Sequence, residues 1–179
     1  MNINDIENMR SELLDRMVDD FNEALIAAGV AEIENEDAPK IVRAILDEIG
    51  DDEGAIGEFY FSPIDSEDDE VQIFNALITL SEEVREESLA NLYEAMSYIN
   101  FTIPSGAFSI DKDHRFLCFR LSVPMGIDAG REEVYELINI ATANAVAIAD
   151  GYAGVLMDVI DEKMSLNDVT DFLGGIADE

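Results

Sequence analysis

The sequence is poor in the residues that most often carry chemistry. It holds one cysteine, Cys118, one histidine, His114, no tryptophan and only ten lysine and arginine residues. A lone cysteine cannot form an intrachain disulfide, and a zinc centre would lack its usual Cys and His ligands. A histidine-activated nucleophile needs that base oriented beside it. His114 follows Asp111 and Asp113 in a charged turn, so we interpret it as solvated, and Cys118 as a small buried residue of a strand.

Acidic residues dominate the charge. The chain has 41 aspartate and glutamate residues, which gives a formal net charge of −31. We expect no binding to nucleic acid or to anionic membranes, because a polyanionic protein is repelled by both. Three interpretations of the acidity stay open: an ordinary acidic cytoplasmic protein or one from a salt-rich cytoplasm, an acidic surface that steers a basic partner segment, and carboxylates that bind metal ions.

The length and the apolar content fit a soluble globular protein. Apolar residues make up 48% of the 179 residues, which is enough for a sizeable core in one domain. We see no uninterrupted apolar run of about 18 residues, the length that a membrane helix needs. The first ten residues, MNINDIENMR, contain no apolar stretch of the kind found in signal peptides. We therefore expect a cytoplasmic location.

Hydrophobic periodicity predicts a mixed order of helices and strands. Apolar residues recur every three or four positions in the expected helices, whereas they alternate in the expected strands. The 71–80 segment has apolar residues on both alternating faces, so we expect both faces to be partly covered. The helices are expected at 5–28, 39–49, 86–100, from after 128 to 162, and from after 165, and the strands at 57–64, 71–80, 107–110 and 115–123.

No motif for catalysis, cofactor binding or metal binding emerges. The acidic clusters at 51–53 and 67–70 lack the central glycine and the spacing of a calcium-binding EF-hand loop. The glycine pairs at 126–130 and 151–154 lack the spacing of a phosphate-binding loop. Carboxylates are so numerous that no pair stands out for glycoside hydrolysis. We assign no catalytic, cofactor-binding or metal-binding residue and expect the protein not to be an enzyme.

One stretch of the chain resembles a known family. Its parts are the strand ALITLSEEV, a helix ending in YEAMSYIN, the segment GAFSIDKDHRFLCFRLSVPMG and the long alanine-rich helix that follows. Over about residues 71–154 the sequence resembles the YbjN family of bacterial proteins, which are described as sensory-transduction regulators. The resemblance implies a fold like that of type III secretion chaperones such as the Tir chaperone: small, acidic, α+β and often dimeric proteins that hold an extended partner segment. It also implies a non-enzymatic, partner-binding role. The first fifty residues lie outside the match.

These observations together predict the fold and a function. We expect an α+β fold with a twisted antiparallel sheet of four or five strands, helices mainly on one face, and residues 1–50 as a helical extension packed on a YbjN-like domain at 51–179. The expected function is a chaperone-like or regulatory adaptor that binds another protein or a basic or amphipathic peptide segment, with homodimerisation through any exposed strand surface. The alternative is a carboxylate-based metal-binding protein or an enzyme of unknown substrate. The candidate contact residues are the strand phenylalanines, which would otherwise belong to the core: Phe59, Phe61, Phe74, Phe116 and Phe119.

Overall fold

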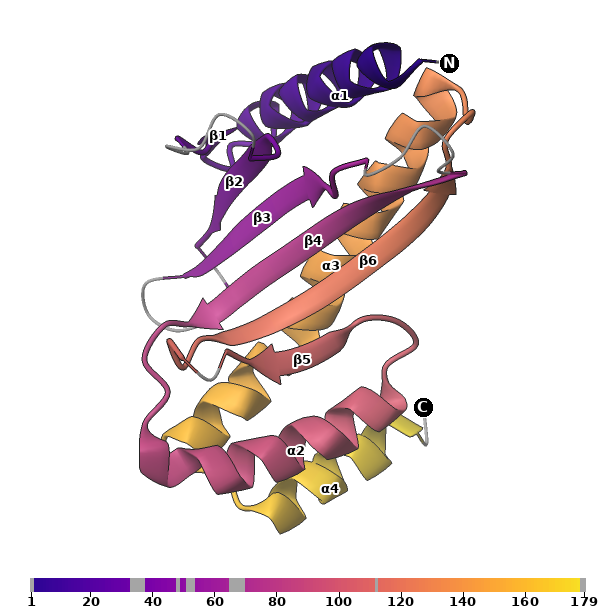
Figure 1. Cartoon of the computed structure of the whole chain (residues 1–179). Coiled ribbons are helices and arrows are strands. Elements are labelled where there is room, and N and C mark those ends of the chain that lie inside the picture. The colour runs from indigo at the N-terminus through magenta and orange to yellow at the C-terminus, as the bar shows by residue number, and fades with distance from the viewer. Residues whose placement is uncertain are drawn as a thin grey trace. The chain divides into compact units, whose positions relative to one another are not determined.

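The computed structural model describes residues 2–32, 38–47, 49–50, 54–64, 70–111 and 113–177. Figure 1 shows an α+β chain in which groups of consecutive strands are separated by helices. The helices are α1 (Ile3–Glu23), the 3-10 turn η1 (Glu86–Ser88), α2 (Leu89–Thr102), α3 (Arg131–Ile160) and α4 (Leu166–Ala177). The strands are β1 (Ala28–Val30), β2 (Ile41–Leu46), β3 (Ala55–Phe61), β4 (Val71–Ser81), β5 (Ala107–Ile110) and β6 (Leu117–Gly126).

The strands form one open antiparallel sheet in the order β1-β2-β3-β4-β6-β5. At one edge Val30 of β1 lies opposite Val42 of β2, and at the other edge Phe108 of β5 lies opposite Phe119 of β6. The α+β class and the antiparallel sheet agree with the sequence prediction, but the sheet has six strands rather than four or five.

The additional strands come from the segment that the sequence analysis assigned to helices. The predicted helix at 39–49 is wrong, because Ile41–Leu46 is strand β2 with strict alternation of buried Val42, Ala44 and Leu46. The first helix ends at Glu23 rather than at residue 28, and β1 follows it. The described residues within 1–50 therefore contribute one helix and two strands of the sheet rather than helices alone.

Contacts divide the chain into two compact units, which we describe separately. Unit 1 comprises residues 1–46, 56–77 and 121–144, and unit 2 comprises residues 47–55, 78–120 and 145–179. The elements β4, β6 and α3 each run from one unit into the other.

In unit 1, α1 packs on the sheet through its apolar stripe. Leu13, Leu14 and Met17 are each 2% exposed, and the ring of Phe21 lies 5.4 Å from the ring of Phe59 on β3. Asn2 caps the helix, since its side-chain oxygen accepts a hydrogen bond from the Asp5 backbone N–H. The stripe follows the predicted helical periodicity, and the buried side of α1 also includes Arg10.

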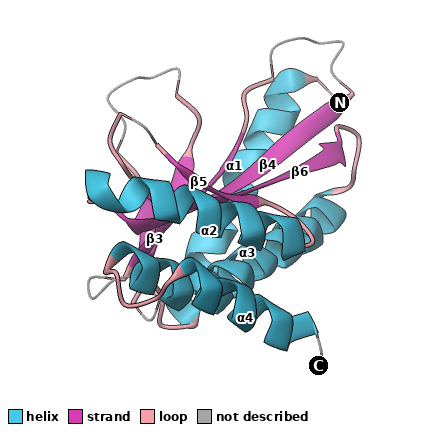
Figure 2. Cartoon of the chain, turned by 90° about the horizontal axis from the view of Figure 1, so that it is seen from below, coloured by secondary structure: helices cyan, strands magenta, loops and turns pink. Residues whose placement is uncertain are grey.

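In unit 2, α2 and α4 lie side by side (Figures 1 and 2). An aromatic series joins β5 to the helices: the Phe108 ring lies 6.0 Å from that of Tyr152 on α3, which lies 6.3 Å from that of Phe172 on α4. The last turn of α3 is capped by Arg85 and Ser88, whose side chains both donate to the Ile160 carbonyl.

Helix α3 is long and apolar. It is the one helix in the described part of the chain that could cross a membrane by length and composition, with a mean hydropathy of 1.3 over its most apolar 18-residue window. A core helix of a soluble protein meets the same criterion. Val134, Ile138 and Leu156 of α3 are fully buried in the protein, as expected for a helix that packs on a sheet.

Candidate protein-binding surface

The phenylalanines proposed from the sequence lie mostly in the core. Phe59, Phe74 and Phe119 are 0% exposed and Phe61 is 4% exposed. Phe116 is half-buried and its ring lies 5.5 Å from the His114 ring. Four of the five candidates therefore supply no exposed contact surface. Large aromatic side chains gain most from burial, which explains why the face that they mark is the one covered by helices.

The opposite face of the sheet in unit 1 is free of the unit's described helices. Along β3, Ala55, Gly57, Phe59 and Phe61 are buried and the residues between them are only half-buried, so the strand has a core face and a second face. Figure 1 draws α3 behind β4 and β6. We name the second face of β2, β3 and β4 in unit 1 the open face. Its residues are Ile41, Arg43, Ile45, Ile56, Glu58, Tyr60, Val71, Ile73, Asn75 and Leu77.

Apolar side chains on the open face reach solvent. Val71 is 49% exposed, Ile45 is 47% exposed and Ile73 is 39% exposed. Ile56 and Leu77 lie on the same face and are half-buried. Ile45 lies on β2, whereas Val71 and Ile73 lie on β4, on the other side of β3. Single exposed apolar residues are normal on proteins, but several on one sheet face mark a candidate interaction surface.

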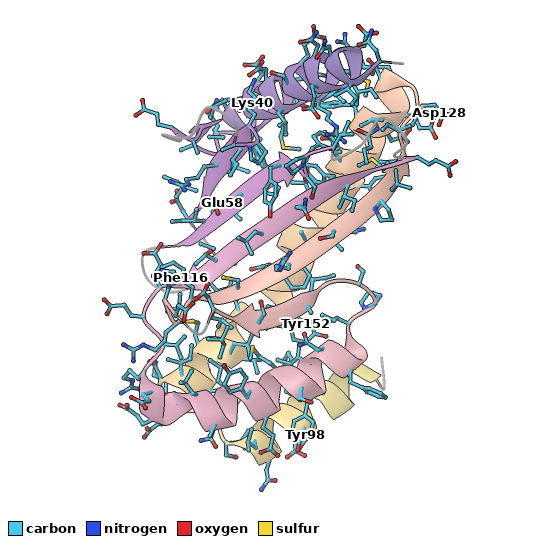
Figure 3. The ribbon with its side chains drawn as sticks, in the orientation of Figure 1. Lys40, Glu58, Tyr98, Phe116, Asp128 and Tyr152 are labelled. Carbon is cyan, nitrogen blue, oxygen red and sulfur yellow. The ribbon has the colours of Figure 1, made fainter. Side chains whose placement is uncertain are left out.

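One ion pair lies among these apolar residues. The Nη2 atom of Arg43 is 2.6 Å from Oε1 of Glu58, with the two side chains 54% and 22% exposed. Figure 3 labels Glu58 on β3. Among the ten described residues of the open face Glu58 is the only acidic one, although the chain contains 41 acidic residues. The described residues of the open face are therefore electrically neutral together, in a protein of net charge −31.

Polar residues fix the strands beside this face. The Asn75 side chain donates to the Ser62 hydroxyl at 2.9 Å and accepts from the Ser122 hydroxyl at 2.8 Å. These bonds link β4 to β6 and to the end of β3, and they satisfy an amide that is 7% exposed. A satisfied buried amide holds the strands in one arrangement, so the surface is preformed.

On the core side, a buried arginine holds the same strand ends. Arg10 of α1 is 2% exposed, and it donates to Gln72 at 3.1 Å, to Glu7 at 2.7 Å and to the Ser62 carbonyl at 3.1 Å. Its guanidinium carbon lies 5.0 Å from the centre of the Phe61 ring. Burial lowers the pKa of Arg10, and the Glu7 carboxylate partly offsets this effect. The network joins α1 to β3 and β4 beneath the open face.

The other residues considered from the sequence form no cluster with this surface. His114 and Asp111 share a turn in which Asp111 accepts hydrogen bonds from the backbone N–H groups of His114 and Asp113. The hydrogen bond from the His114 backbone N–H is the main cause that lowers the pKa of Asp111, and the bond from Asp113 lowers it further. Cys118 is buried, and its sulfur lies 3.6 Å from the Thr79 hydroxyl. Among the described residues no group of three or more His, Cys, Asp or Glu side chains could hold a metal ion. The acidic clusters at 51–53 and 67–69 lie outside the described residues.

Sequence reasoning located β3 and β4 but not β1 or β2, and it missed which alternating set is exposed. The sequence does show apolar residues on the second face, because Ile45, Ile56 and Ile73 stand at the positions that alternate with the buried residues of their strands. Choosing between the two sets requires knowing which side the helices cover, and alternation alone does not tell this.

Comparisons with known proteins give structural neighbours only. No family model matches the chain, and no curated protein matches it. Among solved structures, Escherichia coli YbjN, whose family the sequence resembles, aligns with a TM-score of 0.44 and 11% identity over 79% of this chain and 91% of YbjN. An uncharacterised protein from Methanothermobacter thermautotrophicus aligns with a TM-score of 0.43 and 14% identity over 84% of this chain and 98% of its own. At these values the alignments carry no argument about function.

Proposed function

We propose that this protein is a non-enzymatic, chaperone-like or regulatory adaptor that binds a segment of another protein on its open face. The observation that carries the proposal is the exposed apolar surface of β2, β3 and β4, with its single acidic residue already paired to Arg43. Burying such a surface against a partner releases water from apolar area, at about 25 cal/mol per Å². No charge would be left unpaired by that burial.

The chain's acidity sets the kind of partner. An apolar segment can pack on the exposed apolar residues of the open face. Basic residues on either side of that segment are attracted by a chain of net charge −31. Such long-range attraction raises the association rate more than the final affinity. The proposed partner is therefore an amphipathic segment with basic flanks, and its binding weakens as salt screens the attraction.

Two matched variants test this proposal. Ile45 and Val30 are each 47% exposed β-branched residues on neighbouring strands. Val30 lies opposite buried Val42, so it belongs to the core-side face, whereas Ile45 belongs to the open face. The wild type, I45T and V30T would be immobilised and exposed to lysate of the source cell, with retained proteins identified by mass spectrometry.

The expected result is a protein that the wild type and V30T retain and that I45T loses. Retention of no specific protein by the wild type, or equal loss by both variants, contradicts the proposal. The metal-binding alternative predicts a different result, namely a rise in Tm with calcium, magnesium or manganese that follows mass action. The adaptor proposal predicts an unchanged Tm with all three ions.

A further inference from the structure

An asparagine side chain is bonded to the backbone at each edge of the sheet. The strand order places β1 at one edge and β5 at the other. In unit 1 the side-chain nitrogen of Asn22 donates to the Ala28 carbonyl at 3.2 Å, and its oxygen accepts from the Ala28 N–H at 3.3 Å. In unit 2 Asn100 donates to the Phe108 carbonyl at 3.0 Å and accepts from the Phe108 N–H at 2.8 Å. Each carboxamide therefore satisfies both backbone groups of one edge residue.

On β1 these backbone groups face away from the sheet. The Ala27 carbonyl accepts a hydrogen bond from the Ile45 N–H, just before the strand. The Ala31 N–H donates to the Ile41 carbonyl, just after it. Residues of an antiparallel edge strand face the neighbouring strand alternately, so Ala27 and Ala31 face β2 and Ala28 faces outward.

The same argument applies to β5. The Asp111 N–H, one residue beyond the strand, donates to the Phe116 carbonyl and continues the register of the β5–β6 pairs. Asp111 therefore faces β6, and Phe108, three residues earlier, faces outward. Asn100 thus binds the groups to which a further strand would have to bond.

Each asparagine reproduces one step of a strand ladder. In an antiparallel pair two residues exchange both of their N–H···O bonds, and a carboxamide carries the same donor and acceptor as a peptide group. Strand β1 has three residues and β5 has four, so Ala28 and Val30 are the outward-facing residues of β1, and Phe108 and Ile110 those of β5. With Ala28 and Phe108 occupied, an incoming strand meets one remaining outward-facing residue on each edge strand.

The edge strands carry little other protection. Native proteins shield exposed edges with short strands, charged side chains, proline or bulges. Both strands are short, but their sequences, AGV and AFSI, hold no charge and no proline, although charged residues make up 28% of the chain. Repulsion between the negative chains acts mainly at low salt, because the screening length falls from about 10 Å at 0.1 M to about 3 Å at 1 M. At high salt the edges therefore depend on another form of protection.

From these observations we propose that Asn22 and Asn100 are edge guards, which prevent further strands from adding to β1 and β5. Each guard lies in the last turn of the helix that precedes its edge strand, and each helix contacts that strand (Figure 1). The helix fixes the asparagine backbone, so the side chain is held beside the strand. The bonds of Asn22 are longer and more exposed than those of Asn100, which makes the guard on β5 the stronger one.

Light scattering and infrared spectroscopy on the full chain test this proposal in about 1 M salt, where charge repulsion is screened. The variants are N22A, N100A and N22A/N100A. The matched controls are N8A and N91A, because Asn8 and Asn91 are exposed asparagines of the same two helices. Thermal unfolding followed by circular dichroism shows whether each variant is folded.

We expect the controls to keep the particle mass of the wild type. N100A opens one edge and should double its particle mass, because two β5 edges pair about a twofold axis and the contact closes. N22A/N100A opens both edges and should form extended assemblies with the infrared band of intermolecular sheet. A folded double variant that keeps the wild-type mass contradicts the proposal. Equal growth of the controls, or growth without the intermolecular band, contradicts it as well.

A rescue variant separates edge pairing from aggregation of unfolded chains. Ala107 is exposed on β5 and lies opposite Arg120, so N100A/A107E places a charge on the opened edge beside an oppositely charged neighbour. It should return to the wild-type mass, whereas N100A/N91E, with the same added charge away from the edge, should associate like N100A. Equal behaviour of these two variants contradicts the proposal. The measurements involve no partner, so their outcome is independent of the proposed function.

Discussion

The guanidinium of Arg43 and the carboxylate of Glu58 form a 2.6 Å ion pair on the open face of the sheet. Both groups reach solvent, and exposed pairs of this kind contribute about 0–1 kcal/mol to stability. The pair matters more for recognition, because it leaves the open face neutral while allowing a partner to reach either charge.

Removing one charge of this pair should cost little stability. We expect E58Q to lower the free energy of unfolding by less than about 1 kcal/mol, and the charge swap R43E/E58R to restore most of that loss. Denaturant unfolding of the three proteins measures both effects. A loss several times larger for E58Q, or no recovery in the swap, would show that the pair is a structural element of the sheet rather than part of a surface.

The Arg10 network should respond to size and polarity in different ways. R10A removes a buried side chain and leaves Gln72 and the Ser62 carbonyl without their donor, so we expect a loss of about 3 kcal/mol. R10M leaves the same acceptors without their donor, but it keeps most of the volume and removes a buried charge whose Nη2 atom has no hydrogen-bond partner. Its loss should be less than half as large. Equal losses in the two variants would mean that the charge, rather than the packing, stabilises α1 on the sheet.

Tyr135 should make stability depend on pH in the alkaline range. Its hydroxyl donates to Asp20, and Arg16 lies over its ring at 3.7 Å. Burial, and then the bond to Asp20, raise the pKa of Tyr135 above its ordinary value. Because the pKa is raised in the folded state, the protonated Tyr135 hydroxyl contributes its full stabilisation below the ordinary tyrosine pKa of about 10. This stabilisation is lost as the pH rises through the folded-state pKa.

Two measurements check this behaviour. The difference in ultraviolet phenol titration between the wild type and Y135F should show a midpoint above about 10. At neutral pH, Y135F should lose about 1 kcal/mol of stability through the missing hydrogen bond. A phenol that titrates at or below the ordinary value would contradict the placement of Tyr135 against Asp20.

Gly106 should tolerate no side chain. Its φ angle is +75°, and a Cβ atom there would lie 2.6 Å from the Arg120 carbonyl and also meet the Phe119 ring. We expect G106A to destabilise the protein by about 2–4 kcal/mol. Gly130 has nothing within 4 Å of such an atom, so G130A is the matched control, and thermal unfolding of both variants gives the comparison. Similar Tm values for the two would exclude the tight turn before β5.

The sequence predicted the long elements well because their periodicity is unambiguous. The α3 stripe and the alternation in β3 specify the type of each element. Strand β2 was mistaken for a helix because Ile41, Val42, Ile45 and Leu46 fit a helical stripe as well as an alternating strand. Its hydrogen bonds to β1, which are not visible in the sequence, make it a strand.

The binding surface was harder to predict than the fold. Phe59 and Phe74 drew attention because of their size, and the same size places them in the core. Ile45 and Val30 are chemically similar and equally exposed, yet they lie on opposite faces of the sheet. Only the position of the helices distinguishes the two faces, and that position depends on contacts between distant parts of the chain.

Titration calorimetry with the partner retained by the wild-type protein tests the open face most directly. Ile45→Thr should raise the partner's Kd about tenfold, equivalent to about 1.4 kcal/mol, because it removes apolar contact area, while Val30→Thr should bind like the wild type. Equal affinities for all three proteins, or equal weakening by both substitutions, would show that the partner binds elsewhere and would contradict the account.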